Sequence, residues 1–272
     1  MVSGRFKNSK AKYIILVTLP LLLLGIVGMY YFPWFPGNKL LHSLPRGAKA
    51  LAAEEIIFKG QGFDILQIDP KKQELRLYWK DNAGHPYGSF EALRDSLSKE
   101  GKTLRFATNA GIFSENQTPG GLHIEDGKQL RSLNLNEGEG NFHMKPNGVF
   151  MLGAEGPGVV ESQEFSQSEA APTIATQSGP LLVIDGELHP AFREGSENKH
   201  IRNGVGVDKA GKIWFALSHE RVNFFDFASL FKDQLHCPDA LYLDGSISGF
   251  YLPELNRNDF HHDFCGILAV VD

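Results

Sequence analysis

Asp244 stands where an apolar run meets a small, flexible segment, a position that suits a carboxylate with a chemical role. It follows residues 240–243 and precedes the glycine-bounded stretch 245–249. The run predicts a buried strand, and a carboxylate at its end costs free energy unless it is paired, solvated or used. Asn109 ends a second such run, 104–108, and is also followed by small residues. The two strand ends predict one shared pocket, although an Asp-Gly pair is equally typical of a hairpin turn.

Several common catalytic motifs are absent from the sequence. It has no Gly-rich phosphate loop with Lys-Ser/Thr, no nucleophile elbow and no His-Glu-x-x-His pattern, which argues against nucleotide-binding, esterase and zinc-protease functions. No metal-ligand spacing occurs either, so the sequence predicts no metal or other cofactor. Four short polar motifs at predicted strand ends remain: Asn109-Ala-Gly-Ile-Phe113, Gln177-Ser-Gly-Pro-Leu-Leu182, Arg202-Asn-Gly-Val-Gly-Val-Asp208 and Leu243-Asp-Gly-Ser-Ile-Ser-Gly249.

In this order and at this spacing, the four motifs resemble those of the phosphodiester glycosidase family. The family patterns are Asn-Gly-Gly-Phe-Phe, Gln-Ala-Gly-Pro-Leu-Leu, Arg-Thr-Ala-Val-Gly and Leu-Asp-Gly-Gly-Gly-Ser, and the resemblance covers residues 103–272. Ala110 and Ser178 replace small residues of the patterns. Ile247 stands where a glycine is usual, so the loop after Asp244 is bulkier than the family pattern.

The resemblance implies an enzyme that cleaves the bond between a sugar and a phosphate. Positive charge develops at the anomeric carbon in such a reaction, so a carboxylate there stabilises the charge or attacks the carbon, and Asp244 is the candidate. Arg202 would offset the charge of the leaving phosphate through its forked guanidinium. Glu220, just past a predicted strand, is a second candidate acid or base. The residues implied to bind substrate are Asn109, Gly111, Gln177, Gly179, Gly245 and Ser248.

Each of these polar side chains also has a purely structural alternative. Arg202 could pair with Asp208 in a surface salt bridge. Glu220 could pair with its neighbour Arg221 or cap the following helix. Asn109 could simply supply a left-handed turn conformation. The sequence leaves these alternatives open.

Short strands and a few helices must position the motifs. Residues 89–100 predict a helix that Ser89 caps and Gly101 ends. Asn223 predicts the start of a second helix, whose phenylalanines face the core. The predicted strands are 56–69, 74–80, 103–108, 122–124, 129–133, 148–152, 173–177, 180–184, 205–207, 213–217, 240–243, 249–252 and 267–271. Many strands with few helices predict an α+β fold with a large mixed β-sheet.

The N-terminal part of the sequence predicts a membrane anchor. Residues 13–32 are apolar almost throughout, and about 20 such residues span a bilayer. Residues 1–12 carry basic and no acidic side chains, so this end is expected in the cytoplasm and the rest outside it. An Ala-x-Ala pattern at 50–52 lies far beyond the apolar run, which favours an uncleaved anchor in the cytoplasmic (inner) membrane over a cleaved signal peptide. A stem, 33–55, and one domain, 56–272, would follow.

The net charge and the cysteine content limit the kinds of binding partner and disulfide that the sequence allows. The net charge of −5 at pH 7 does not favour nucleic acid. The expected partners are a carbohydrate or sugar-phosphate substrate and, through the N-terminal helix, the membrane. Cys237 and Cys265 both lie in the part expected to be exported, where they could pair or stay buried as free thiols.

Two functions remain open. The first is a membrane-anchored glycosidase outside the cytoplasm that hydrolyses a sugar-1-phosphodiester, with an N-acetylglucosamine-like sugar, in an envelope glycan or polymer. The second is a non-catalytic protein of the same fold that binds carbohydrate or assembles exopolysaccharide. Asp244 and Arg202 favour the enzyme, because a binding module needs neither a carboxylate at an anomeric carbon nor a cation at a leaving phosphate.

Overall fold

A computed structural model describes residues 50–114, 116–245, 247–260 and 263–272 of the chain. The predicted cytoplasmic segment, membrane span and most of the stem lie outside these residues. No helix within the described ranges combines the length and hydropathy needed to cross a bilayer. The first strand begins at Ala52 and Leu51 is buried, so the folded domain starts before the predicted boundary at residue 56.

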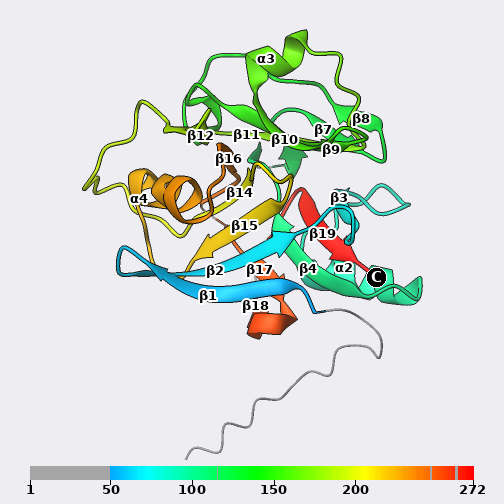
Figure 1. The fold of residues 1–272 in the computed structure, drawn as a ribbon. Coiled ribbons are helices and arrows are strands. Elements are labelled where there is room, and N and C mark those ends of the chain that lie inside the picture. The colour runs from blue at the N-terminus through cyan, green and yellow to red at the C-terminus, as the bar shows by residue number, and fades with distance from the viewer. Residues whose placement is uncertain (1–49, 115, 246, 261–262) are drawn as a thin grey trace, which may run out of the picture. The chain divides into compact units, whose positions relative to one another are not determined.

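Seven strands form the largest sheet, in the order β1-β2-β15-β14-β16-β12-β13 (Figure 1). They are β1 (Ala52–Phe58), β2 (Gln61–Ile68), β12 (Leu181–Ile184), β13 (Glu187–Leu188), β14 (Asn203–Val207), β15 (Ile213–Ser218) and β16 (Asp239–Tyr242). Every neighbouring pair is antiparallel. Because antiparallel strands alternate in direction, the start of β14 and the ends of β15 and β16 lie at one edge of the sheet.

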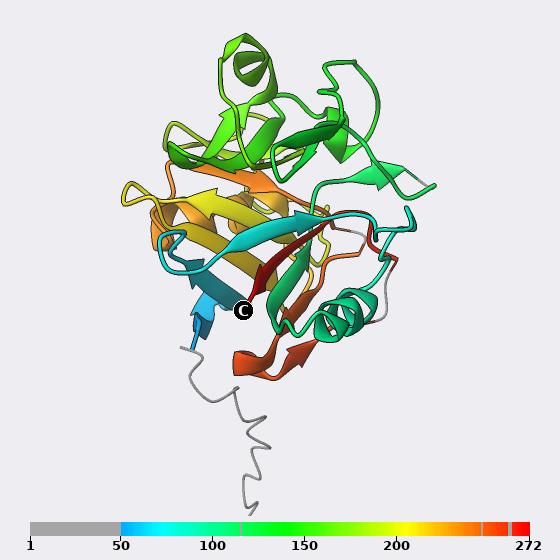
Figure 2. The same ribbon diagram turned by 90° about the vertical axis from the view of Figure 1, so that its right-hand side faces the viewer.

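Two five-stranded sheets and a two-stranded ribbon complete the described domain. The order β10-β9-β11-β7-β8 joins β7 (His123–Glu125), β8 (Lys128–Arg131), β9 (Gly148–Gly153), β10 (Gly156–Glu161) and β11 (Ile174–Ser178). The order β18-β17-β4-β19-β3 joins β3 (Leu75–Tyr78), β4 (Leu104–Asn109), β17 (Phe250–Leu252), β18 (Arg257–Asn258) and β19 (Ile267–Val271). The ribbon pairs β5 (Phe113–Ser114) with β6 (Thr118–Pro119). Figures 1 and 2 both place the β7–β11 sheet, drawn in green, above the seven-stranded sheet.

The prediction of one large mixed sheet is wrong, whereas the dominance of strands over helices agrees with the predicted α+β class. The pairs within all three sheets of the described residues are antiparallel. Parallel pairs need crossover connections of about a dozen residues or more, usually helical, and the described helices are few. Hairpins such as β14–β15 instead return the chain directly beside itself.

The helical elements are α2 (Phe90–Lys99), α3 (Ser162–Gln167), α4 (Phe224–Ser229), a π-helical turn η2 (Leu230–Gln234) and the 3-10 turns η1 (Asn141–His143) and η3 (Pro253–Leu255). The predicted helix at 89–100 is confirmed as α2. Its cap Ser89 accepts a hydrogen bond from Ala92 N at 3.1 Å, and Gly101 follows its end with a φ of 75°. The predicted helix after Asn223 is confirmed as α4 and η2, and Asn223 Oδ1 accepts from Asp226 N at 2.8 Å.

The seven-stranded sheet is covered on both faces. On one face, Phe227 of α4 and Phe231 of η2 pack with Phe63 and Tyr242. The opposite face packs apolar side chains of β2, β14 and β16 against those of β4 and β17. Since consecutive strand residues point to opposite faces, neighbours in one motif can lie in different environments.

Candidate active site

Two sheets meet at the edge where β14 starts and where β15 and β16 end. Arg202 O accepts from Ser218 N at 3.0 Å, which aligns the end of β15 with the start of β14. Asn203 O accepts from Leu243 N at 3.2 Å, which aligns the end of β16 with the same point. β4 of the neighbouring sheet ends there as well, at Asn109. The structure therefore brings the Asn109, Arg202 and Asp244 motifs together.

Asn203 is the residue that joins the two sheets at this edge. Its Nδ2 donates to Asn109 Oδ1 and to Thr108 Oγ1, both at 2.9 Å. Its Oδ1 accepts from Asp244 N at 3.0 Å and also lies 3.2 Å from Ser248 Oγ. Sequence reasoning quoted this residue within the Arg202 motif but gave it no role. The available signal was similar to that of Asn109, a polar residue at a strand end followed by a small residue.

Asn109 is buried and works inside the network. Its Oδ1 also accepts from Gly249 N at 3.1 Å, so it fixes the far end of the loop that begins at Asp244. The backbone of Asn109 is extended and pairs with Ile267 across β4 and β19. That conformation rules out the left-handed turn as the reason for an asparagine here.

The Asp244 loop connects two sheets and is not a hairpin. The preceding strand β16 pairs with β12 and β14, whereas the following strand β17 pairs with β4 and β18. Ser248 Oγ donates to Asp244 O and thereby closes the loop on itself. Asp244 is partly exposed. Ile247, the departure from the family pattern, packs against the cluster around Phe90 and Phe264, so its bulk is absorbed by an apolar surface.

Two other motif glycines allow close approach between backbone segments. A Cβ at Gly111 would lie 2.2 Å from Gln177 O, and one at Gly179 would lie 2.7 Å from Phe142 O. Gly111 N also donates to Thr176 Oγ1 at 3.2 Å. The structure therefore gives both glycines a packing role beside the site.

Gln177 is buried and has all its polar atoms engaged within the protein. Its Oε1 accepts from Leu122 N at 3.0 Å and from Asn134 N at 2.9 Å. Its Nε2 donates to Asn134 O at 2.8 Å and to Ser162 Oγ at 3.0 Å. The side chain ties segments of the β7–β11 sheet together, and the structure does not present it to a ligand.

Arg202 lies on the α4 face of the sheet and is 0% exposed. Its Nε donates to Val222 O at 2.9 Å, its Nη2 donates to Asn198 O at 3.1 Å, and the guanidinium stacks 3.5 Å from the centre of the Phe224 ring. Asp208 instead accepts from Trp214 Nε1 at 3.0 Å, so the surface salt bridge does not form. The predicted direct fork onto a leaving phosphate is not available in this arrangement either, because the guanidinium is enclosed.

The charge of Arg202 is not neutralised by a carboxylate among the described residues. Burial lowers the pKa of this guanidinium below its ordinary value. A buried charge without a counter-ion is costly, and in a low-dielectric interior its field reaches further than in water. Arg202 therefore makes this end of the sheet favourable for an anion, even without direct contact.

A second polar group borders the same edge at the end of β15 and the start of β2. Glu220 is exposed and its Oε2 accepts from Gly62 N at 3.1 Å, while the described residues show no ion pair between Glu220 and Arg221. Beside it, His219 Nε2 lies 2.8 Å from Oδ1 of the buried Asp64, whose Oδ2 accepts from Arg257 Nη1 at 3.2 Å. Asp64 was missed, although it interrupts an apolar strand.

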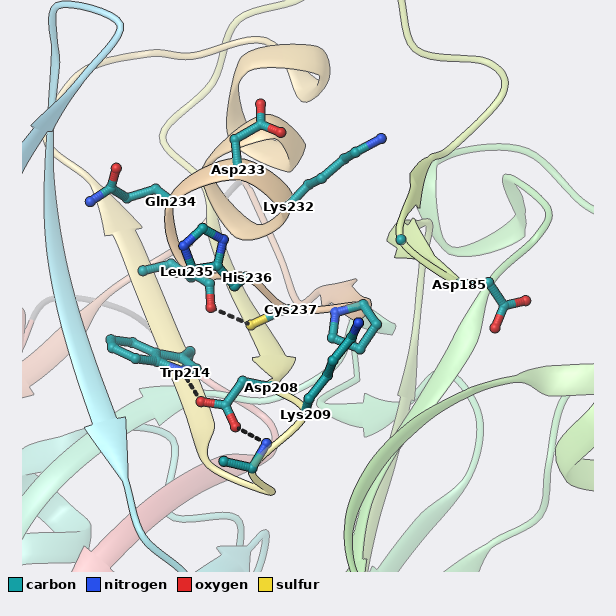
Figure 3. Close-up of a pocket in the computed structure, with 13 residues that line it drawn as sticks. Asp185, Asp208, Lys209, Trp214, Lys232, Asp233, Gln234, Leu235, His236 and Cys237 are labelled. Atoms are coloured by element: carbon teal, nitrogen blue, oxygen red, sulfur yellow. Dashed lines mark hydrogen bonds between the residues drawn. The ribbon is translucent and has the colours of Figure 1, made fainter.

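A groove of about 950 Å³ lies at the opposite end of the same sheet, between the turn after β14, η2 and the turn after β12 (Figure 3). None of the predicted site residues lines it. Lys209 and Lys232 share it with Asp185, Asp208 and Asp233, so its charge has both signs and gives no preference for an anion. Across the described residues, no His, Cys, Asp and Glu side chains form a group suited to a metal ion.

Comparisons with known proteins agree with the motif pattern. Residues 102–263 match the model of the phosphodiester glycosidase family. The chain is 38% identical over 185 residues to the uncharacterized protein YigE of Escherichia coli K12. The aligned region covers 68% of this chain and 72% of YigE. The catalytic domain of zebrafish N-acetylglucosamine-1-phosphodiester alpha-N-acetylglucosaminidase, auto-inhibited by its pro-peptide, has a similar fold, with a TM-score of 0.56, 17% identity and coverage of 84% of this chain and 85% of that one. The chain belongs to the phosphodiester glycosidase family.

Proposed function

We propose that this protein hydrolyses a sugar-1-phosphodiester. The observation that carries the proposal is the meeting of Asp244 with the Asn109–Asn203 network at a sheet edge that also holds a buried, unneutralised arginine. A carboxylate suits the positive charge that develops at an anomeric carbon, and an uncompensated cation suits a departing phosphate. The family and the zebrafish fold support N-acetylglucosamine, or a similar sugar, as the first substrate to test.

In the proposed reaction, Asp244 faces the anomeric carbon. The oxygen of water ends up bonded to that carbon, and the carbon–oxygen bond to phosphate breaks with its electron pair on the phosphate oxygen. The products are a free sugar and a phosphate monoester. The leaving group is already acidic, so the field of Arg202 replaces much of the protonation that a sugar alcohol would require. Glu220, which is exposed at the same edge, is the candidate to take the proton from water.

The test is release of free sugar from synthetic N-acetylglucosamine-1-phosphodiesters, measured by chromatography. Asp244→Asn keeps the size of the side chain and removes its charge, so we expect turnover to fall by at least about 100-fold. Asp185→Asn is the matched control, because Asp185 also precedes a glycine but lies in the turn between β12 and β13. Equal activity of the Asp244 variant and the wild type would contradict the assignment.

The non-catalytic alternative is an outcome of the same assay. Asn109, Asn203 and Gln177 are all engaged inside the protein, which is compatible with a scaffold that binds a glycan without turning it over. Binding of envelope polysaccharide without sugar release from any diester of the panel would favour that function.

The proposed setting is the outer side of the cytoplasmic membrane, with residues 13–32 as the anchor and an envelope glycan or polymer as the natural substrate. The apolar run and its basic N-terminal flank support this. An alkaline phosphatase reporter fused to the C-terminus should be active, because that enzyme needs an oxidising compartment. An inactive reporter in a chain that accumulates normally would contradict the orientation.

A further inference from the structure

The hydroxyl of Tyr242 lies directly beneath the loop that carries Asp244. Tyr242 is 0% exposed, and its ring packs edge-on against Phe224 at 4.9 Å between centroids. A Cβ built on Gly245 would lie 1.8 Å from Tyr242 Oη, so only a glycine lets the loop cross the hydroxyl at this height. The φ of Gly245 is not in the left-handed region. Close approach, and not backbone conformation, is the reason for this glycine.

Tyr242 Oη and Arg202 Nη1 are both buried, and neither makes a well-formed hydrogen bond within the described part of the chain. Such groups are rare in native proteins and call for an explanation. The two side chains are neighbours, with the guanidinium carbon 5.3 Å from the centre of the Tyr242 ring. Burial raises the pKa of Tyr242, and the charge of Arg202 opposes that rise without cancelling it, so the phenol keeps its proton.

The direction of that proton follows from the chemistry of the pair. A guanidinium has only donors, so toward Arg202 the phenol oxygen can act only as an acceptor. The Tyr242 hydrogen is therefore left for the other side, where the backbone at Gly245 crosses the hydroxyl. Asp244 is close enough to raise the pKa of Tyr242. Arg202 contacts Tyr242, and Tyr242 contacts the backbone at Gly245. These contacts connect the core to the loop.

We propose that Tyr242, oriented by Arg202, is a positioning residue that holds the backbone at Gly245 and thereby sets the position of the Asp244 carboxylate. This rests on the proposed function, since it assigns Asp244 its reacting role. It also gives Arg202 a task that a fully enclosed guanidinium can perform. Arg202 thus affects the reaction by orienting Tyr242 and by the electric field of its buried charge. It does not bind the phosphate directly.

A double-mutant cycle tests the proposal. Tyr242→Phe keeps the ring and removes the hydroxyl on which the loop rests, so we expect kcat for diester hydrolysis to fall about tenfold, with KM within about twofold of the wild-type value. Gly245→Ala forces the loop off the hydroxyl, and a displacement of about 1 Å at a reacting group is expected to lower kcat about 100-fold. Tyr242→Phe removes the atom nearest the new Cβ and leaves the ring carbon Cζ at 3.1 Å, so the double variant should regain most of the activity that Gly245→Ala loses.

Tyr251→Phe is the matched control, because Tyr251 is partly buried in β17 and its ring stacks on Phe260, away from Gly245. Its kcat and KM should equal those of the wild type. A Tyr242→Phe variant with wild-type kcat, or a double variant no better than Gly245→Ala, would overturn the inference while leaving the proposed function intact. A loss confined to KM would also overturn it, since a misplaced carboxylate lowers kcat.

The melting temperature gives a readout that does not depend on activity. Gly245→Ala should lower the melting temperature clearly more when residue 242 is tyrosine than when it is phenylalanine, because the closest contact of the new Cβ is with the hydroxyl. Equal effects in both backgrounds would show that the hydroxyl does not support the loop. A wild-type protein that cleaves no diester would instead reject the proposed function, and with it the role given to Asp244, whatever the melting temperatures show.

Discussion

Asn203 uses both ends of one side-chain amide to hold together segments that are distant in the chain. Its amide nitrogen donates to Thr108 and Asn109 of β4, and its amide oxygen accepts from Asp244 N and lies 3.2 Å from Ser248 Oγ. A carboxylate or an aliphatic side chain of similar size cannot supply both. An amide at this position is therefore a requirement of the junction between the two sheets, and the Asp244 loop depends on it.

Replacing Asn203 should show which end of the amide matters. Asn203→Ala leaves several buried donors and acceptors without partners, so we expect a loss of about 2–4 kcal/mol in the free energy of unfolding. Asn203→Asp keeps the acceptor for Asp244 N but sets a second oxygen against Asn109 Oδ1 and buries a charge, so it should be at least as destabilising. Urea denaturation measures both. An aspartate variant as stable as the wild type would contradict the network.

At the level of single residues, the sequence predicts which positions matter better than it predicts their tasks. Asp244 and Asn109 stand out because polar residues at the ends of apolar runs are unusual. Asn203 carries the same signal, but its importance comes from a partner 94 residues away, which no local pattern contains. Arg202 matches the family motif, yet its enclosure depends on Phe224 and Asn198, whose positions follow only from the complete fold.

At the scale of helices and strands, the close approach of α4 and η2 to the seven-stranded sheet determines which residues β14 can carry. β14 contains Gly204 and Gly206, both facing this layer. A Cβ at Gly206 would lie 2.8 Å from Cys237 Sγ and 2.8 Å from Phe231 Cδ1, and one at Gly204 would lie 3.0 Å from Leu241 O. These glycines let the helical layer sit directly on the strand that begins at the candidate site. The position of Arg202 beneath Phe224 depends on the same approach.

Gly206→Ala should therefore destabilise the domain by overpacking, by about 1–3 kcal/mol in the free energy of unfolding. Gly158→Ala in β10 is the control, because its new Cβ would meet the flexible end of Met151 at 3.3 Å and should be accommodated. Thermal and urea unfolding of both variants provide the measurement. Equal stability of the two variants would show that the layer on β14 yields more easily than the geometry indicates.

At the level of helices and strands, the sequence predicts features that depend on neighbouring residues, but it does not predict features that depend on residues distant in the chain. The helices α2 and α4 were predictable because a capping side chain and an apolar face lie within about a dozen residues. The division of the strands into three antiparallel sheets could not be predicted from the sequence. Its basis is the pairing of β2 with β15 and of β4 with β17, which joins segments more than 100 residues apart. Alternation of apolar and polar residues identifies a strand but does not show which other strand it pairs with.

In the molecule as a whole, the two cysteines occupy separate layers. Cys237 is buried beneath η2 beside Gly206, whereas Cys265 is buried next to Gln117, whose carbonyl oxygen lies 3.2 Å from its Sγ. The structure thus decides between the alternatives left open by the sequence, and both are free thiols. Their burial raises the pKa of each thiol, that of Cys265 to about 12, which also makes them unreactive.

Alkylation should detect this arrangement directly. Without reductant, the folded protein should take up almost no iodoacetamide, and the unfolded protein should gain two labels, one at each cysteine, as read by mass spectrometry. Prior reduction should change neither result. Two labels that appear only after reduction would demonstrate a disulfide and contradict the structure.

Buried phenols and thiols also make the stability of the whole domain sensitive to high pH. Burial raises the pKa of Tyr78 to about 12 and that of Cys265 to about 12, and it raises the pKa of Tyr242 and Cys237 in the same direction. In the unfolded chain these groups lose their protons near their ordinary values of about 8.5 for cysteine and about 10 for tyrosine. Above those values the unfolded state therefore binds fewer protons than the folded state, so stability falls as pH rises.

We expect the free energy of unfolding in urea to be steady near pH 7, to decline from about pH 8.5 and to keep declining until the folded groups titrate near about pH 12. Tyr78→Phe should flatten the upper part of the decline, because it removes one group whose pKa differs between the two states. Lys59→Gln is a surface control that removes neither a phenol nor a thiol, and it should leave the slope of the decline unchanged. A free energy of unfolding that is constant between about pH 8.5 and about pH 11 would show that the unfolded chain holds these protons as firmly as the folded domain does.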